Sequence, residues 1–303
     1  MRPARRDRLD PPDFPEGAPC WADARLADVE AGKRFYGDLF GWTFDEGAGA
    51  ERGYYTAAYS GDRSVAALAP ANRGARWRVH LAVRDAYAAA ERVFAAGGHI
   101  VAGPLPGGTA ATVALARGPE GAVFVLRQAG THRGFEGVGG AGAFRGAELL
   151  TPDAALSDSF YGAVFGEGAF AGASSEGTAP GAVSFEGAAP GTVSSEGAAP
   201  GAASSERADP GTVSFERADP GTVSFGGTGP GDGPSWEAVR RRVVSEGPGR
   251  FLLHFGCADV DATAAAAVRL GGRVRVGPRP MAYGRAAVIQ DDQGAVFVVC
   301  EQA

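Results

Sequence analysis

The chain has 303 residues, 45% of them hydrophobic, and a formal net charge of −6 at pH 7. This length favours two domains with cores of ordinary size. The mildly acidic balance excludes a basic surface for nucleic acid, and three cysteines are too few for a disulfide framework. Because no apolar run is long enough for a membrane span or a signal peptide, we expect a cytoplasmic protein that binds neither nucleic acid nor membranes.

The first structural unit follows a basic, proline-rich stretch, residues 1–18, which we predict to be a disordered tail. A strand over Cys20–Leu26 leads to Asp28, whose side chain can cap a helix over Val29–Phe40. Glycine and aspartate turns then separate three short strand candidates, Thr43-Phe44, Tyr54–Tyr59 and Val65–Leu68.

The second unit contains a stretch that occurs twice in the chain. Residues His80–Pro104 read HLAVRDAYAAAERVFAAGGHIVAGP, and residues His254–Pro278 read HFGCADVDATAAAAVRLGGRVRVGP. In each copy an apolar strand ends at an Asp that can cap a helix, an Ala-rich helix ends at Gly-Gly, and another strand follows. Self-similarity of this kind indicates a repeated structural unit.

The first unit also recurs, after a glycine-rich stretch over residues 131–143 that composition predicts to be a flexible linker. Residues Asp28–Gly41 and Asp153–Gly166 share the initial Asp and a later FYG run that is followed by FG. The chain is therefore unit one, unit two, unit one, unit two. This order predicts an α+β protein with two similar domains, residues 19–130 and residues 144–303.

A low-complexity insert over residues 174–234 interrupts the second domain. Its centre, Glu176–Phe225, repeats decapeptides such as ERADPGTVSF. Regular Pro-Gly pairs with small polar residues cannot bury enough surface to offset the entropy of ordering, so we predict a disordered insert. The alternative is a binding segment whose Thr-Val-Ser-Phe runs form weak strands. Beyond it, Trp236–Val243 has apolar spacing closer to that of a helix, which leaves the sheet of this domain in doubt there.

Several of these runs together form a family pattern. They are Trp21-x-Asp23 with Asp28, FYGDLFGW at Phe35–Trp42, VHLAVRD with AAGG, GPEGAVF, and MAYGRAAVIQDDQGAVFVV at Met281–Val299. The pattern resembles the vicinal oxygen chelate superfamily, which includes glyoxalase I, bleomycin-resistance proteins and extradiol dioxygenases. Its layout is similar to the tandem two-domain members, often called hydroxylases in high-GC bacteria. The resemblance implies two tandem glyoxalase-like domains, each of two βαβββ modules that form a curved sheet around a cleft.

The resemblance also implies where a metal would be held. Metal-using members carry a His in the first strand of a module, shortly before the helix-capping Asp, and a Glu near the end of the last strand. The corresponding positions here are Trp21, Arg78, Gly146, Leu252, and places near Val125 and Val298. A divalent ion needs three or four convergent N, O or S ligands. We therefore expect no metal and no cofactor.

A second position in each first strand carries titratable residues. These are Asp23, His80, Glu148 and His254, one in each unit at the same distance before the capping Asp. Strand alternation places them on the same face as the metal positions of the family. Asp23 can then meet His80, and Glu148 can meet His254. A carboxylate partner orients a histidine and raises its pKa, which suits acid–base catalysis. The alternatives are hydrogen-bonded pairs that only support the sheet, or a bulge that turns one member outward.

Three further side chains are candidates for ligand contacts. Trp21 and Trp77 can stack on a planar or cationic ligand near the mouth of the cleft, or they are simply core aromatics. Arg285 can meet an anionic ligand, or it is a surface arginine.

Three functions remain open. The first is a metal-free protein that binds a small organic ligand in the cleft of the first domain. The second is a cofactor-independent hydroxylase or isomerase that uses one of the carboxylate–histidine pairs, and the third is a metal-dependent lyase or dioxygenase. Because each domain has both of its modules in one chain, monomer and homodimer are equally compatible with the sequence.

Overall fold

A computed structural model describes the following residues: 14–45, 55–71, 74–166, 170, 240–243, 247–281 and 284–301. The predicted insert and most of the predicted tail lie outside these ranges. Among the described residues, no helix is both long and apolar enough to cross a membrane.

The first domain forms an eight-stranded sheet, here called sheet A. Its first unit comprises β1 (Pro19–Leu26), α1 (Val29–Phe40), β2 (Thr43–Phe44), β3 (Thr56–Ser60) and β4 (Arg63–Pro70). Its second unit comprises β5 (Arg76–Ala82), α2 (Ala86–Ala95), β6 (His99–Gly107), β7 (Ala111–Arg117) and β8 (Val123–Ala129). The strand order is β2-β3-β4-β1-β5-β8-β7-β6, so the first strands of the two units lie side by side at the centre, antiparallel to each other.

The second domain forms a six-stranded sheet, here called sheet B. Its elements are β9 (Phe144–Thr151), α3 (Ala154–Phe165), β10 (Arg240–Val243), β11 (Arg250–Cys257), α4 (Val260–Arg269), β12 (Arg273–Met281), β13 (Gly284–Gln290) and β14 (Val296–Glu301). The order β10-β9-β11-β14-β13-β12 repeats that of sheet A, except that the described residues contain no counterpart of β2 and β3. The prediction of two tandem glyoxalase-like α+β domains with curved sheets is confirmed.

Strand β10 corrects one prediction. Its residues fall in the stretch whose spacing was closer to helical, yet they pair in parallel with β9 just as β4 pairs with β1. Pairing with an existing strand outweighs a short, weak apolar pattern.

Each helix begins at the predicted aspartate. The Asp28 carboxylate accepts a hydrogen bond from the Ala31 N–H at 3.0 Å, and the side chains of Asp85, Asp153 and Asp259 accept equivalent bonds. Such caps satisfy N–H groups that a helix start leaves without partners. Helix α1 ends at Gly41, whose φ of 71° is the left-handed conformation that favours glycine.

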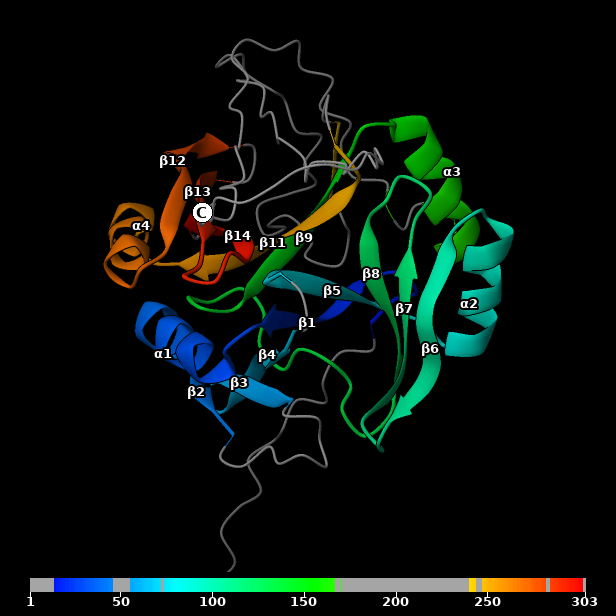
Figure 1. Ribbon diagram of the computed structural model, residues 1–303, viewed down its shortest axis with the longest axis horizontal. Helices are drawn as coiled ribbons and strands as arrows, with labels where there is room; N and C mark the ends of the chain where they lie inside the picture. Colours follow the sequence, from blue (N-terminus) through cyan, green and yellow to red (C-terminus); the bar gives the residue numbers. More distant parts are fainter. Residues whose placement is uncertain are drawn as a thin grey trace, which may run out of the picture.

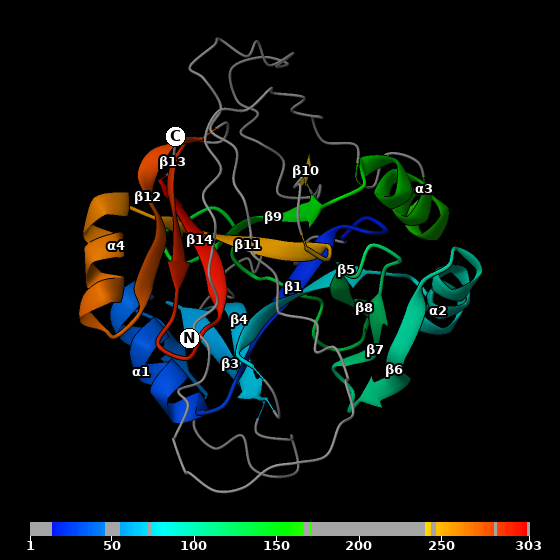
Figure 2. The same ribbon diagram turned by 45° about the horizontal axis from the view of Figure 1, so that its top comes forward.

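The two domains share one hydrophobic core. The cluster contains Val79 and Leu81 of sheet A together with Leu253 and Phe255 of sheet B, all fully buried. Figures 1 and 2 both show α1 beside α4 at one edge of the molecule and α2 beside α3 at the other, with strands of both sheets between the two helix pairs. Each sheet has one face that packs against the other domain in this shared core, which we call its outer face. We call the opposite face of each sheet its inner face.

The domain contact is reciprocal. The Tyr36 hydroxyl on α1 donates to Asp291 Oδ2 of the second domain at 2.8 Å, and the Tyr161 hydroxyl on α3 donates to Glu120 Oε1 of the first at 2.6 Å. Both tyrosines belong to the FYG runs, so this motif joins the domains. A Cβ at Gly98 would lie 2.7 Å from a carbon of the Phe160 ring, and one at Gly272 would lie 3.1 Å from a carbon of the Phe35 ring. The second glycine of each Gly-Gly pair therefore makes room for a phenylalanine of the other domain.

The glycine-rich linker packs against both domains, which differs from the flexible joint that composition predicted. Phe135 is 1% exposed, its ring stacks on Phe144 at 4.4 Å, and its N–H donates to the Cys20 carbonyl at 2.9 Å. The Trp42 indole donates to the Gly142 carbonyl at 2.8 Å. Phe135 within the stretch and Phe144 and Trp42 outside it hold the linker in place through tertiary contacts that composition cannot show.

Candidate functional site

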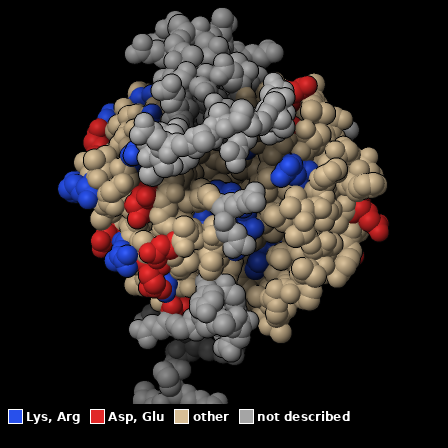
Figure 3. Space-filling model, in the orientation of Figure 1, with Lys and Arg blue, Asp and Glu red and all other residues tan. Residues whose placement is uncertain are grey.

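The inner face of sheet A is lined by side chains that alternate with core residues along three neighbouring strands. They are Trp21, Asp23 and Arg25 on β1, Arg76, Arg78 and His80 on β5, and Val125 and Arg127 on β8. Ala22 and Ala24, which lie between the β1 members, are fully buried in the shared core. Strand alternation therefore gathers polar groups on this face. Figure 3 shows basic side chains at the middle of the molecular face that it presents, over β1 and β5.

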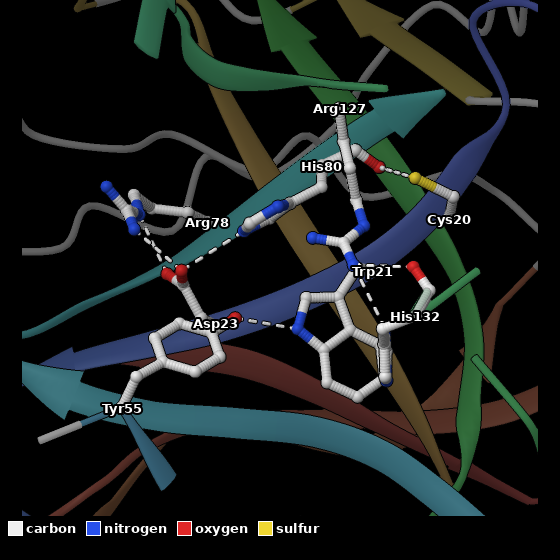
Figure 4. Close-up of polar contacts among 8 residues, drawn as sticks. All are labelled: Cys20, Trp21, Asp23, Tyr55, Arg78, His80, Arg127 and His132. Carbon is white, nitrogen blue, oxygen red and sulfur yellow. Dashed lines mark hydrogen bonds and ion pairs between the residues drawn. The ribbon is translucent and has the colours of Figure 1, made fainter. Parts of the chain in front are cut away.

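Asp23 is the centre of the polar cluster (Figure 4). It is fully buried, and Arg78 grips it with two hydrogen bonds, from Nε to Oδ1 at 2.7 Å and from Nη2 to Oδ2 at 2.6 Å. His80 Nε2 lies 3.1 Å from Asp23 Oδ2. The structure thus brings together Asp23 and His80, as their positions predicted. Arg78 stands at one of the family's metal positions, although an arginine is not a metal ligand. It is the stronger partner of Asp23 because a planar guanidinium matches both carboxylate oxygens.

The electrostatics of the pair differ from the expectation. Burial alone would raise the pKa of Asp23, but the charge of Arg78 and the contact with His80 hold it well below its usual range. Burial lowers the pKa of His80 to about 4 and outweighs the contribution of Asp23, which acts in the opposite direction. The expected rise of the histidine pKa is therefore wrong for His80. Its ring is neutral at pH 7, so Nε2–H donates to Asp23 and Nδ1 keeps a lone pair. That Nδ1 atom is buried and has no hydrogen-bond partner in the described part of the chain.

Arg127 is a second buried guanidinium on this face, 6% exposed. Its Nη2 donates to the carbonyl and to Nδ1 of His132, each at 2.9 Å. Its Nε is buried without a hydrogen-bond partner among the described residues. The carboxylate of the exposed Glu136 acts on His132, which Arg127 contacts, but no ion pair between Glu136 and Arg127 is present in the described part of the chain. Even spacing along β8 places Arg127 on the same face as Val125, a signal that the sequence contained. His132 is half-buried because the packed linker carries it against Trp21.

The ligand-contact candidates separate onto different faces. Trp21 lies on the inner face, 2% exposed, and its indole N–H donates to the Tyr55 hydroxyl at 2.7 Å. Trp77 lies on the outer face, where its indole N–H donates to the Tyr36 hydroxyl and its ring packs on Phe255, with centroids 4.8 Å apart. Trp77 is therefore a core aromatic, which was the alternative to a ligand contact.

Arg285 lies at the surface on β13, beside outer-face residues. It pairs with Asp261 at 2.6 Å, and 42% of its side chain is exposed. The structure therefore does not bring Trp77 or Arg285 together with Asp23 and His80.

The inner face of sheet B repeats the pair in a different setting. Glu148 Oε2 and His254 Nε2 are 3.8 Å apart, and both residues are buried. Leu252 lies opposite Glu148, in the place where Arg78 lies opposite Asp23, and Gly146 lies opposite His254, where Trp21 lies opposite His80. Much of the rest of this face is an apolar cluster formed by Leu150, Leu252, Val276, Ala286, Val288, Val298 and Cys300. Arg250 also lies on this face, opposite Leu150.

Neither inner face assembles a metal site from described residues. Around Asp23 and His80 stand an indole, two guanidinium groups and a valine, and the Asp23 oxygens are already engaged. The one group of described His, Cys, Asp and Glu residues whose ligand atoms converge is Asp259, Asp261 and Glu301. It lies around the start of α4, and Arg285 pairs with one of its members.

Comparisons with known proteins agree with this architecture. Residues 21–127 match a family model described as a glyoxalase-like domain, and residues 145–299 match the model of the Glyoxalase/Bleomycin resistance protein/Dioxygenase superfamily. "Putative glyoxylase CFP32" of Mycobacterium bovis is 30% identical over 302 residues, which cover 96% of this chain and 97% of that protein. "Anthracycline biosynthesis protein DauV" of Streptomyces sp. is 34% identical over 170 residues, 50% of this chain and 62% of that protein.

Among solved structures, the Mn(II)-bound glyoxalase from Novosphingobium aromaticivorans aligns with a TM-score of 0.56 and 15% identity, over 95% of this chain and 83% of that one. At this identity the likeness concerns the fold alone.

Replacing Asp23 by Asn should destabilise the protein strongly. The change leaves Arg78 largely buried without a counter-charge, which typically costs about 3–5 kcal/mol. Asp261→Asn is the matched control, because Asp261 pairs with Arg285 at the surface, where an ion pair contributes at most about 1 kcal/mol. Denaturant titration at pH 7 measures both. Equal losses of unfolding free energy would contradict the buried role of Asp23.

The stability of the protein should depend on the protonation of His80. Since the folded-state pKa is about 4 and the ordinary value is 6.5, the unfolded chain binds the proton more readily. The stabilisation from neutral His80 is therefore complete above pH 6.5 and is lost as the pH falls toward 4. His80→Gln should flatten the fall of unfolding free energy over this interval, whereas His99→Gln, at an exposed position, should leave it unchanged. Indistinguishable profiles for His80→Gln and the parent protein would refute this assignment.

Proposed function

The chain belongs to the glyoxalase/bleomycin resistance/dioxygenase superfamily, and within it we propose that the chain is a metal-free protein that holds a small organic ligand against the inner face of sheet A. The observation that carries the proposal is the pair of buried atoms His80 Nδ1 and Arg127 Nε, which have no partner within the described residues. A buried polar atom without a hydrogen bond costs about 1–3 kcal/mol. A ligand that supplies the missing partners recovers this free energy on binding.

The donor set favours binding without a metal. A divalent ion needs several convergent ligands, and here only Asp23 and His80 are of ligand type. Arg78 occupies both oxygens of Asp23, and its positive charge beside them opposes a second cation. We therefore derive no step through a metal ion, although the fold is shared with an Mn(II)-bound glyoxalase.

The aromatic residues of the site suit an organic ligand. Trp21 and His132 meet edge to face, with ring centroids 4.5 Å apart, and the Tyr55 hydroxyl fixes the orientation of the indole. Rings held in this way offer apolar surface without further ordering cost. Since one relative is named for anthracycline biosynthesis, anthracyclines belong in the first set of ligands to be tested.

A second candidate function is proton transfer by a cofactor-independent isomerase. Asp23 holds the Nε2–H of a neutral His80, so the Nδ1 lone pair is the acceptor that a general base requires. Hydroxylation would also need dioxygen and a source of electrons, so isomerisation is the simpler reaction for these residues.

Metal removal should not affect ligand binding. The purified protein should carry less than one equivalent of any divalent ion by elemental analysis. Anthracyclines and other small aromatic compounds that raise its melting temperature should do so equally before and after treatment with EDTA. A bound stoichiometric ion whose removal abolishes the response would overturn the proposal in favour of a metal-dependent lyase or dioxygenase.

His80→Gln separates binding from catalysis. For any compound that the protein converts, this variant should lose turnover altogether, because Gln donates to Asp23 but cannot accept a proton as imidazole does. Binding should only weaken, by the roughly 5- to 150-fold that the lost contact with Nδ1 represents. The Glu148→Gln variant in the second domain is the control. If turnover persists in His80→Gln, the base function is wrong and the binding function stands.

A further inference from the structure

The inner face of sheet A carries more positive than negative charge. Arg25 and Arg76 lie opposite each other in the β1–β5 register, one step from the Asp23–Arg78 pair. Burial lowers the pKa of Arg25, and the neighbouring charges of Arg78 and Arg76 lower it further, which shows that these cations lie close together. Among the described residues of β1, β5 and β8 that line this face, Asp23 is the one carboxylate, and Arg78 already neutralises it. Glu136 of the linker lies near His132, but it is exposed to solvent.

Arg127 adds a charge that the described residues do not neutralise. It is buried at the far side of His80 from Asp23, and its charge disfavours protonation of both His80 and His132. The pKa of the Tyr55 phenol is raised well above its ordinary value, chiefly by burial and also by the charge of Asp23, although the charge of Arg127 opposes this rise. A buried cation without a counter-ion is costly, and a bound anion is the usual remedy.

We propose that the ligand of the first domain is an organic anion, a carboxylate that pairs with Arg127 and carries an adjacent hydroxyl that donates to His80 Nδ1. This inference rests on the proposed function and specifies its ligand class. Arg127 and His80 lie on neighbouring strands of one face, β8 and β5, so one hydroxy acid can reach both groups. Related proteins of this fold hold a metal cation, and guanidinium groups supply the positive charge here. The site can therefore attract a negatively charged ligand.

The second domain provides an internal contrast. In the strand pairing of sheet B, Leu252 stands where Arg78 stands, and Cys300 lies at the end of β14 in the apolar cluster. Arg250 lies on this inner face, opposite Leu150, and its Nη2 atom is buried. No counterpart of Arg78 or Arg127 stands on β11 or β14, however, because Leu252 and Cys300 take those places. The anion site that we propose for the first domain is therefore not repeated there.

The test compares each acid with its uncharged primary amide. The probes are mandelate and 3-hydroxy-2-naphthoate beside mandelamide and 3-hydroxy-2-naphthamide, titrated into the full chain at low ionic strength, with calorimetry as the readout. The acid should bind at least about 10-fold more tightly than its amide, since a charged hydrogen bond is worth more than this ratio requires. Arg127→Gln should remove the preference, and Arg25→Gln should reduce it. Arg285→Gln, which removes a distant surface charge, should leave it intact.

The possible results separate this inference from the proposed function. Loss of the acid preference in Arg127→Gln supports the anion site, as does a reduced preference in Arg25→Gln if the first variant does not fold. An unchanged preference in a folded Arg127→Gln variant overturns it. If acids and amides bind equally, or if the first domain binds only neutral compounds of the wider aromatic set, the anion inference fails and metal-free binding stands. If neither the probes nor the wider set binds, both proposals fail.

Discussion

The burial of both outer faces in one common core is the constraint on which the rest of the structure depends. Val79 and Leu81 of β5 and Leu253 and Phe255 of β11 are fully buried there. Because side chains alternate along a strand, committing these positions to the core sends their neighbours to the inner faces. The side chains of the candidate sites are therefore those that the core does not use. A shift of either strand by one residue would turn them toward the core and break the contact between the domains.

Much of this arrangement could be predicted from the sequence because it is duplicated. The repeated His-containing strand and the repeated FYG run gave the two domains, the helix caps and the meeting of Asp23 with His80. Alternation alone would also have placed Trp77 correctly, since its odd spacing from His80 puts it on the opposite face. Alternation along β8 also predicts that Arg127 shares the face of Val125. Because arginine does not bind metals, however, the family's metal pattern gives no signal for it.

Other features depend on tertiary structure and have no local signal. The pKa of His80 is set by burial, which no spacing reveals, so a carboxylate partner wrongly suggested a rise. The linker was expected to be flexible from its glycine content, but Phe135 anchors it on Phe144 and brings His132 to the site. Composition describes the freedom of an isolated chain, whereas the two domains supply the surfaces that remove this freedom.

The reciprocal fit of Phe35 on Gly272 and Phe160 on Gly98 has a consequence for the history of the molecule. Each half carries both a projecting ring and a receiving glycine, so the surface of either half is complementary to a copy of itself. The two halves therefore pack against each other through equivalent contacts, as two related subunits would. Because the halves belong to one chain, their sequences can differ at equivalent places: sheet A carries Arg78 and Arg127 where sheet B carries Leu252 and Cys300.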